Sequence, residues 1–212
     1  MLQRIVIFAG GTLGDWALAH LRADDTLIGA DSGARFLIEN GYSPDIAIGD
    51  FDSVTESEMA SIRARSKQTI ACDPIDKDYT DTEMAFRLAL DMKPAELLLM
   101  GALGTRFDHS LANVHLLALA DEHGIPAQIV DEHNQVRIVS ATSVVHMQDH
   151  PQLSLLPLTE RVTGITLKGF RYPLHEATLT IGQSLGISNV LIGEEGIVAL
   201  REGKLLVIQS RD

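Results

Sequence analysis

The hydrophobic pattern of the chain changes once, near residue 135, and this change limits the possible folds more than any other feature. Before it, short apolar runs alternate with segments of helical periodicity, which is typical of a parallel sheet covered by helices. After Asn134, short alternating segments follow one another between Gly and Pro residues. The sequence therefore predicts two domains, a Rossmann-like α/β domain over residues 1–138 and an antiparallel β-sandwich domain over residues 139–212.

Capping signals and apolar runs place the elements of the first domain. Thr55 with Glu58, and Thr80 with Glu83, have the spacing of a helix-starting capping box. A third helix is expected over about residues 108–123, followed by a closing glycine. Buried strands are expected at residues 4–9, 26–30, 45–48, 68–71 and 96–100.

The second domain has six short apolar segments and one strong turn signal. The pair Glu202-Gly203 separates the last two segments and predicts a hairpin between them. The segments are residues 136–139, 153–156, 164–167, 177–181, 196–200 and 204–208.

Charge and cysteine usage exclude several classes of function. The 212 residues contain 17 Lys and Arg against 29 Asp and Glu, a formal net charge of −12, so no basic field is available to hold a nucleic acid or an anionic membrane. No apolar run approaches the roughly 20 residues that a spanning helix needs. Cys72 is the single cysteine, and no signal peptide is visible, so we expect a cytoplasmic protein.

Polar residues collect where each predicted strand of the first domain ends. The carboxyl ends of parallel strands meet at one edge of a sheet, where ligands bind in open α/β folds. The sequence therefore predicts one shared ligand crevice. The groups are residues 10–11, 31–33, 49–53, 73–81 and 101–108.

The aspartates of these groups indicate a metal site. In an extended backbone Asp50 and Asp52 would share a face while Phe51 points the other way. Together with Asp31 and Asp81 they could bind a hard divalent cation, and Mg²⁺ fits best because the chain lacks a thiolate or histidine cluster for zinc. A solvated acidic loop is the alternative explanation of a lone D-x-D pair.

Two further groups could bind phosphate. Lys77 and Asp78 precede Thr80, which lies at a predicted helix start, although ordinary helix capping explains part of this pattern. Arg106 offers a fork for phosphate and Asp108 could accept a proton or orient a hydroxyl, with a surface ion pair between them as the alternative. No P-loop and no G-x-G-x-x-G motif is present.

In their order along the chain, these motifs resemble the thiamine pyrophosphokinase family. Two small departures from the family pattern, Ser32 and Thr105, replace residues that are commonly glycine. The resemblance covers nearly the whole chain. The matching stretches are A-D-S-G-A at 30–34, P-D at 44–45, G-D-F-D-S at 49–53, K-D-Y-T-D-T-E at 77–83, G-T-R-F-D-H at 104–109 with L-A-N at 111–113, S-L-L-P-L at 154–158, G-F-R-Y-P-L at 169–174 and G-I-S-N at 186–189.

The resemblance implies an activity and roles for these residues. The enzyme would transfer the pyrophosphoryl group of ATP to the hydroxyl of thiamine, leaving AMP, with Mg²⁺ as cofactor and a homodimer as the active form. In the implied arrangement Asp31, Asp50, Asp52 and Asp81 bind magnesium, Lys77 and Arg106 contact phosphates, Asp108 lies near the thiamine hydroxyl, Ser188 and Asn189 belong to the thiamine-binding loop, and Asp78, Thr80, Asn113 and Asn134 are nucleotide contacts.

Two other functions remain open on the residues alone. The aspartates fit another magnesium-dependent nucleotide phosphohydrolase equally well, and the same scaffold could serve as a non-catalytic nucleotide or thiamine sensor. Thiamine-dependent formation of AMP separates the kinase from both.

Overall fold

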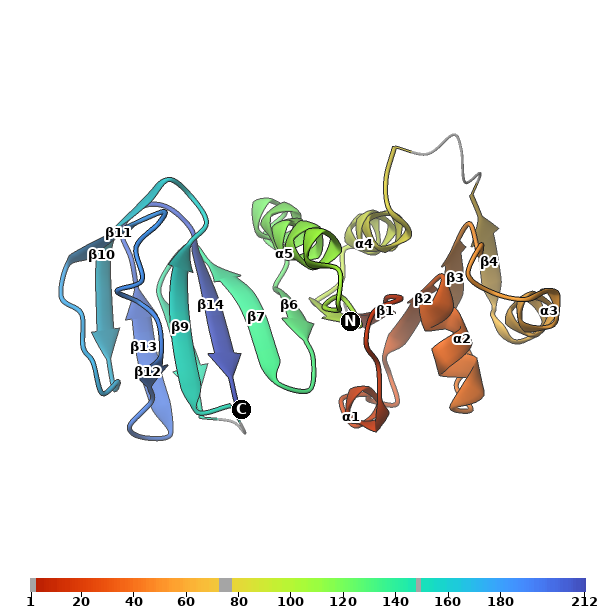
Figure 1. Cartoon of the computed structure of the whole chain (residues 1–212), viewed down its shortest axis with the longest axis horizontal. Helices are drawn as coiled ribbons and strands as arrows, with labels where there is room; N and C mark the ends of the chain where they lie inside the picture. Colours follow the sequence, from red (N-terminus) through yellow and green to blue (C-terminus); the bar gives the residue numbers. More distant parts are fainter. Residues whose placement is uncertain (1–2, 73–77, 148–149) are drawn as a thin grey trace. The chain divides into compact units, whose positions relative to one another are not determined.

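The computed structural model describes residues 3–72, 78–147 and 150–212, and the chain divides into two compact units (Figure 1). The first unit is Met1–Glu132 and the second is His133–Asp212. The fold is mixed α/β, with helices confined to the first unit in the described ranges. No helix in those ranges is both long and apolar enough to cross a membrane.

The first unit is built on parallel strands. Within the described residues their order is β6-β5-β1-β2-β3-β4, and every neighbouring pair is parallel. The runs of β1, β2 and β5 are buried almost throughout, as expected of strands covered on both faces. Their bounds are β1 Arg4–Phe8, β2 Thr26–Ala30, β3 Ile46–Gly49, β4 Gln68–Ala71, β5 Glu96–Met100 and β6 Ala127–Val130.

Helices cover both faces of these strands, with α4 and α5 on one face and α1 and α2 on the other (Figure 1). Val6 and Phe8 of β1 pack with Ala17 of α1 and Leu37 of α2 in one apolar cluster. The bounds are α1 Asp15–Leu18, α2 Ser32–Glu39, α3 Glu56–Arg65, α4 Asp81–Asp91 and α5 Phe107–Glu122.

The expected helix starts are confirmed, with one difference in detail. Thr55 and Glu58 form a full capping box at α3. Thr80 caps α4 by accepting a hydrogen bond from the backbone N–H of Glu83. The Glu83 side chain instead pairs with Arg87, at 2.8 Å, one helical turn along.

The second unit contains strands in two antiparallel arrangements. One has the order β12-β9-β14-β7 and the other β11-β10-β13-β8. Buried side chains from both, among them Val139, Leu155, Ile165, Val198 and Val207, form one apolar cluster. The bounds are β7 Asn134–Val139, β8 Ser143–His146, β9 Gln152–Pro157, β10 Arg161–Lys168, β11 Ala177–Thr180, β12 Asn189–Val190, β13 Glu195–Ala199 and β14 Leu205–Ser210.

The predicted hairpin around residues 202–203 is wrong. β13 pairs with β10 and β8, whereas β14 pairs with β7 and β9, so the two strands lie in different sheets. Gly203 has a φ of 94°, and an added Cβ there would lie 2.6 Å from the carbonyl oxygen of Arg161, so this turn position favours glycine. The chain uses this turn to cross between sheets.

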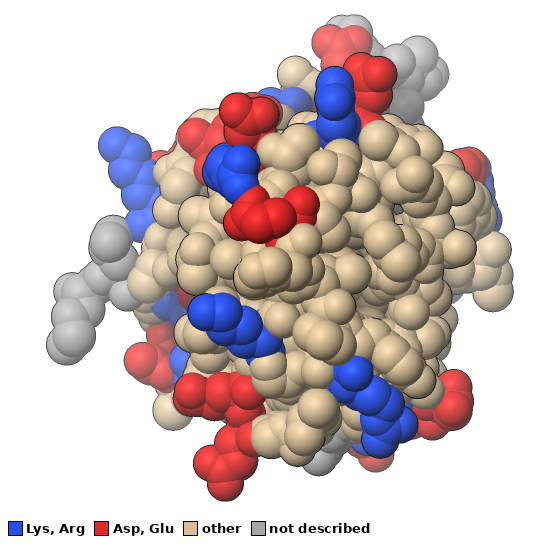
Figure 2. Space-filling model, turned by 90° about the vertical axis from the view of Figure 1, so that its left-hand side faces the viewer, with Lys and Arg blue, Asp and Glu red and all other residues tan. Residues whose placement is uncertain are grey.

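One face of the second unit has few charges. Val144 of β8 and Ile197 of β13 are paired across the sheet and are 42% and 39% exposed. Figure 2, which views the left-hand side of Figure 1, shows an uncharged central area with Lys, Arg, Asp and Glu around it.

Candidate functional site

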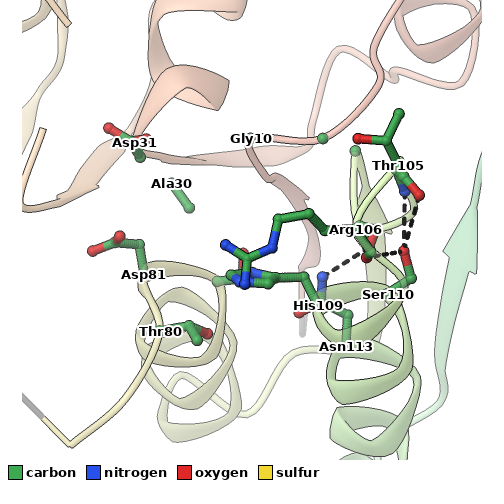
Figure 3. A pocket seen from close by; sticks show the side chains of 15 residues that line it. Gly10, Ala30, Asp31, Thr80, Asp81, Thr105, Arg106, His109, Ser110 and Asn113 are labelled. Carbon is green, nitrogen blue, oxygen red and sulfur yellow. Dashed lines mark hydrogen bonds between the residues drawn. The ribbon is translucent and has the colours of Figure 1, made fainter. Parts of the chain in front are cut away.

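A pocket of about 310 Å³ lies in the first unit, where β1, β2 and β5 end and α4 and α5 begin (Figure 3). Its walls come from the polar groups that follow these strands, which confirms that they meet at one edge. Among the described residues the lining consists of Gly10, Gly11, Ala30, Asp31, Thr80, Asp81, Thr82, Gly101, Ala102, Gly104, Thr105, Arg106, His109, Ser110 and Asn113.

The backbone after β1 passes unusually close to the backbone after β5. A Cβ at Gly11 would lie 2.3 Å from the carbonyl oxygen of Gly101, and the Gly11 N–H donates to that oxygen at 2.8 Å. Gly101 has a φ of 64°, a conformation that favours glycine. The glycines therefore allow two loops to meet and form one side of the pocket.

Three carboxylates come together beside this pocket. Asp31, Asp50 and Asp52 each offer an oxygen within 4.8 Å of the others. Asp81 lies close to them, because its Oδ1 accepts a hydrogen bond of 3.2 Å from the backbone N–H of Asp50. Figure 3 shows the Asp31 and Asp81 side chains on the same side of the pocket. All four predicted metal ligands thus belong to one neighbourhood.

Unusual backbone angles orient this cluster. Asp31 has a φ of 49° and Phe51 a φ of 57°, in the region that residues other than glycine rarely adopt. Phe51 is only 6% exposed and packs with Ala34 and Ile62. The extended backbone expected for residues 50–52 is therefore wrong, although Phe51 is buried while Asp50 and Asp52 offer oxygens to one cluster.

The acid cluster makes Asp31 an unfavourable anion in the absence of a cation. Burial raises the pKa of the Asp31 carboxyl, and the charges of Asp81 and Asp52 raise it further, while a hydrogen bond from Ser53 acts in the opposite direction. The Ser53 hydroxyl donates to Asp31 Oδ2 at 2.7 Å. Asp31 Oδ1 is buried and has no hydrogen-bond partner in the described part of the chain. Clustered carboxylate oxygens, one of them unsatisfied, fit a hard divalent cation.

Arg106 and Asp108 form an exposed ion pair at the start of α5. The Arg106 guanidinium contacts Asp108 through two nitrogens, at 2.6 and 3.3 Å. The side chains are 69% and 65% exposed. This hydrogen bonding lowers the pKa of Asp108 to about 2. The ion-pair alternative is therefore present in the structure, and Arg106 also reaches the pocket, as Figure 3 shows. Asp108 is not among the described residues that line the pocket.

The remaining nucleotide candidates lie in different places. Thr80 and Asn113 line the pocket, and the buried Asn113 amide donates to the carbonyl oxygen of Ala102 at 2.8 Å. Asp78 is exposed just before α4. Asn134 belongs to the second unit, in β7, where it pairs with Ser210. Lys77 lies outside the described residues.

Ser188 and Asn189 lie in the second unit and differ in their surroundings. Ser188 is exposed, with a φ of 57°, and its N–H donates to the Ser154 hydroxyl at 3.1 Å. Asn189 is 5% exposed and bonds the backbone of Tyr172 twice, at 3.0 and 2.7 Å. The Asn189 amide therefore holds the loop around Tyr172.

Sequence reasoning missed two hydroxyl groups. Ser53 orients Asp31, and Ser110 lines the pocket and bonds the loop before α5. Ser53 lies in the G-D-F-D-S stretch, so its distance of one residue from Asp52 was a usable signal. Ser110 lies four residues after Arg106, the spacing at which a helical serine can reach a preceding carbonyl.

Both units match the same protein family. Residues 18–129 match the family described as "Thiamin pyrophosphokinase, catalytic domain", and residues 141–205 match "Thiamin pyrophosphokinase, vitamin B1 binding domain". The chain belongs to the thiamin pyrophosphokinase family. Both descriptions name an enzyme, a pyrophosphokinase. The match of both units to this family confirms the resemblance seen in the sequence motifs.

Relatives of known name support this membership over the full length. The thiamine pyrophosphokinase of Bacillus subtilis is 33% identical over 187 residues, covering 87% of this chain and 87% of the relative. A crystal structure of thiamine pyrophosphokinase from Bacillus subtilis superposes with a TM-score of 0.91 at 31% identity, covering 99% of this chain and 100% of that one. A crystal structure of thiamin pyrophosphokinase from Geobacillus thermodenitrificans superposes with a TM-score of 0.89 at 32% sequence identity, and the match covers 99% of this chain and 98% of that one.

Proposed function

We propose that the chain is a thiamine pyrophosphokinase that transfers the pyrophosphoryl group of ATP to the hydroxyl of thiamine, releasing AMP and thiamine diphosphate. The observation that carries this proposal is the placement of the acid cluster and Arg106 around one pocket in a chain whose two units match the two domains of that family. Cations and carboxylates at one pocket are the groups that phosphoryl-transfer enzymes use.

Asp31, Asp50 and Asp52, with Asp81 beside them, would hold Mg²⁺. The cluster offers only oxygen ligands, which magnesium prefers, and a bound cation would satisfy Asp31 Oδ1 and offset the repulsion among the carboxylates. The ion would neutralise charge on the transferring phosphates. Lys77, outside the described residues, and Arg106 would contact phosphate oxygens, with Asp78, Thr80, Asn113 and Asn134 as further nucleotide contacts.

Most of the rate enhancement would come from positioning the two substrates. The thiamine hydroxyl must approach the β-phosphorus of ATP opposite the bond to AMP, and the pocket residues would hold both groups in that line. Arg106 would stabilise the charge that develops on the phosphates. Asp108, with a pKa of about 2, is a weak base, so we assign it the role of orienting the hydroxyl through a hydrogen bond.

The second unit would help to bind thiamine. Ser188 would contact thiamine, which its exposure supports, while Asn189 would fix the loop through the Tyr172 backbone. In this proposal the first unit is a Rossmann-like nucleotide domain and the second unit is a β-sandwich thiamine domain.

We further propose that the enzyme is a cytoplasmic homodimer. The uncharged area on one face of the second unit supports contact between copies (Figure 2), and the single free Cys72 suits a reducing compartment. Light scattering at assay concentrations tests the dimer, since a monomer mass contradicts it.

Product analysis tests the proposed activity. With ATP, thiamine and Mg²⁺, AMP should appear only when thiamine is present. Release of ADP, or AMP without thiamine, would indicate a hydrolase, and binding without turnover would indicate a sensor.

Substitution of the cluster tests the role of the metal ligands. Asp50→Asn or Asp52→Asn should reduce turnover by at least about 100-fold, because each removes a charged ligand from transition-state stabilisation. Circular dichroism should show an unchanged fold. Asp91→Asn, at the exposed end of α4, is the matched control and should retain full turnover. Wild-type rates in both cluster variants at limiting Mg²⁺ contradict the proposal.

A further inference from the structure

We infer that Ser110 is a positioning residue: its hydroxyl fixes the turn that carries Arg106 and so sets where the guanidinium meets the phosphates of the nucleotide. The inference rests on the proposed function, because it assigns Arg106 to ATP. Ser110 lies in the first turns of α5 and lines the pocket next to Arg106 (Figure 3).

The Ser110 hydroxyl ties together both ends of a short loop. Its Oγ accepts a hydrogen bond of 3.1 Å from the backbone N–H of Gly104. The same hydroxyl can donate to the carbonyl oxygen of Arg106 at 3.1 Å or to that of Gly104 at 3.4 Å. The backbone N–H of Ser110 also donates to the Arg106 carbonyl oxygen at 3.1 Å. One side chain thus joins the residues on either side of Thr105.

These contacts go beyond the usual behaviour of a helical serine. A serine that bonds the carbonyl four residues earlier is common and local. Gly104, in contrast, lies outside α5, which begins at Phe107. A bond to its N–H therefore fixes the loop relative to the helix.

Apart from the Ser110 bonds, few described contacts fix residues 104–106 to the start of α5. Arg106 is the N-cap residue, and its side chain makes no capping hydrogen bond to the helix. The N–H groups of Gly11 and Thr12 bond the carbonyl oxygens of Gly101 and Leu103, so the loop is held as far as Leu103, whereas an added Cβ at Gly104 would meet nothing closer than 3.8 Å. The Asn113 side chain, one turn further along α5, donates a hydrogen bond to the carbonyl oxygen of Ala102. The Ser110 hydroxyl makes the corresponding bonds to the backbone of Gly104 and Arg106.

Loss of this anchor should affect the nucleotide more than the fold. Arg106 is 69% exposed, so its backbone must be fixed if the guanidinium is to be held in place. A displacement of the reacting groups by a fraction of an ångström is enough to slow a positioned reaction. We therefore expect the effect of Ser110 to pass through Arg106.

The first test compares Ser110→Ala, which removes the hydroxyl, with Ser110→Thr, which keeps it. We expect Ser110→Ala to lower kcat/KM for ATP about tenfold and to weaken binding of Mg²⁺ with α,β-methylene-ATP about as much, with KM for thiamine within about twofold. Ser110→Thr should restore both values to within about threefold of wild type. Equal losses in the Ala and Thr variants overturn the inference.

A double-mutant cycle tests whether Ser110 acts through Arg106. In an Arg106→Ala background, Ser110→Ala should cost less than about a further twofold in kcat/KM for ATP, because the group it positions is absent. Losses that multiply show an independent role and overturn the inference. Ser61→Ala, a half-buried helical serine in α3 outside the pocket lining, is the control and should match wild type.

The two proposals fail in different ways. A wild-type chain that forms no AMP from ATP and thiamine overturns the proposed function, and the inference with it. An active wild type that Ser110→Ala matches in both kcat/KM and analogue binding overturns the inference alone.

Discussion

Asp31 is held in the folded chain in a way that costs stability. Its backbone has a φ of 49°, its Oδ1 is buried without a hydrogen-bond partner in the described chain, and nearby carboxylates oppose its charge. Such strain is common where a site is prepared for a ligand. At this residue, function and stability have opposite requirements.

Asp31→Asn should therefore stabilise the metal-free protein while it abolishes activity. Burial raises the pKa of Asp31 in the folded state, so the stability cost applies at pH values above this raised pKa and disappears as the pH falls below the ordinary value for aspartate. Thermal melts in EDTA should show a higher Tm for the variant at pH 7 and a smaller difference at pH 4. A lower Tm for Asp31→Asn at pH 7 would contradict this account.

Arg106 stabilises the anionic form of Asp108. The guanidinium lowers the pKa of Asp108 to about 2. Arg106→Gln should raise that pKa towards 3.8, the ordinary value, because the carboxylate loses its cationic hydrogen-bond donor. A carbon-13 NMR titration of the aspartate carboxyl groups measures the change. An unshifted Asp108 would show that another group stabilises its anion.

The site could be predicted from the sequence in its composition but not in its fine geometry. Parallel strands end at one edge, so Asp31, Asp50 and Asp81 could be placed together from their positions after the strands and before α4. The positive φ of Phe51 could not be predicted from the sequence, because it depends on packing against α2 and α3. The loop-holding bonds of Asn189 likewise depend on tertiary contacts.

Among the elements, α2 sits very close to β1, and Gly33 makes this possible. A Cβ at Gly33 would lie 2.0 Å from the carbonyl oxygen of Phe8, a backbone atom that cannot easily move. Gly33→Ala should destabilise the protein by about 3 kcal/mol or more, because a core overpacked against backbone must rearrange. Urea denaturation measures this.

A glycine in open space provides the control. At Gly193 an added Cβ meets nothing within 4 Å, so Gly193→Ala should change stability by less than about 0.5 kcal/mol. Equal midpoints for the Gly33 and Gly193 variants would contradict the close packing of α2 on β1.

Elements with strong local signals were predicted, and those without were missed. The five expected strands of the first unit and the capped starts of α3 and α4 are present. α1 has only four residues, and α2 follows Asp31, whose side chain makes no capping bond, so neither has a clear start signal. The residues at 202–203 indicate a turn, but they do not indicate which strands the flanking segments pair with.

On the scale of the molecule, the acidic charge makes a cation important. With a net charge of −12, the chain repels a triphosphate unless a metal ion offsets the field. An ion that binds only the folded state adds about 2.7 kcal/mol at 100 times its dissociation constant.

Mg²⁺ should accordingly raise the Tm of the wild type above its value in EDTA. Asp50→Asn should show little of this increase, because it lacks one ligand of the cluster. NaCl at matched ionic strength separates specific binding from screening. An equal increase with NaCl would argue against a magnesium site.

The division of the chain illustrates the limit of local patterns. The change in pattern indicates two units, and in the structure they divide after Glu132. β7, which falls largely within the first predicted domain, is part of the second unit because it pairs with β14, some 70 residues later. Only long-range pairing decides where such a strand belongs.

The position of β14 also has a consequence for biosynthesis. It is the last described strand along the chain, yet it lies between β7 and β9 and bonds to both. While the protein emerges from the ribosome, β7 and β9 must wait with unpaired edges until residues 205–210 arrive. A chain whose translation stops early would carry two open strand edges, and quality-control proteases could recognise and remove it.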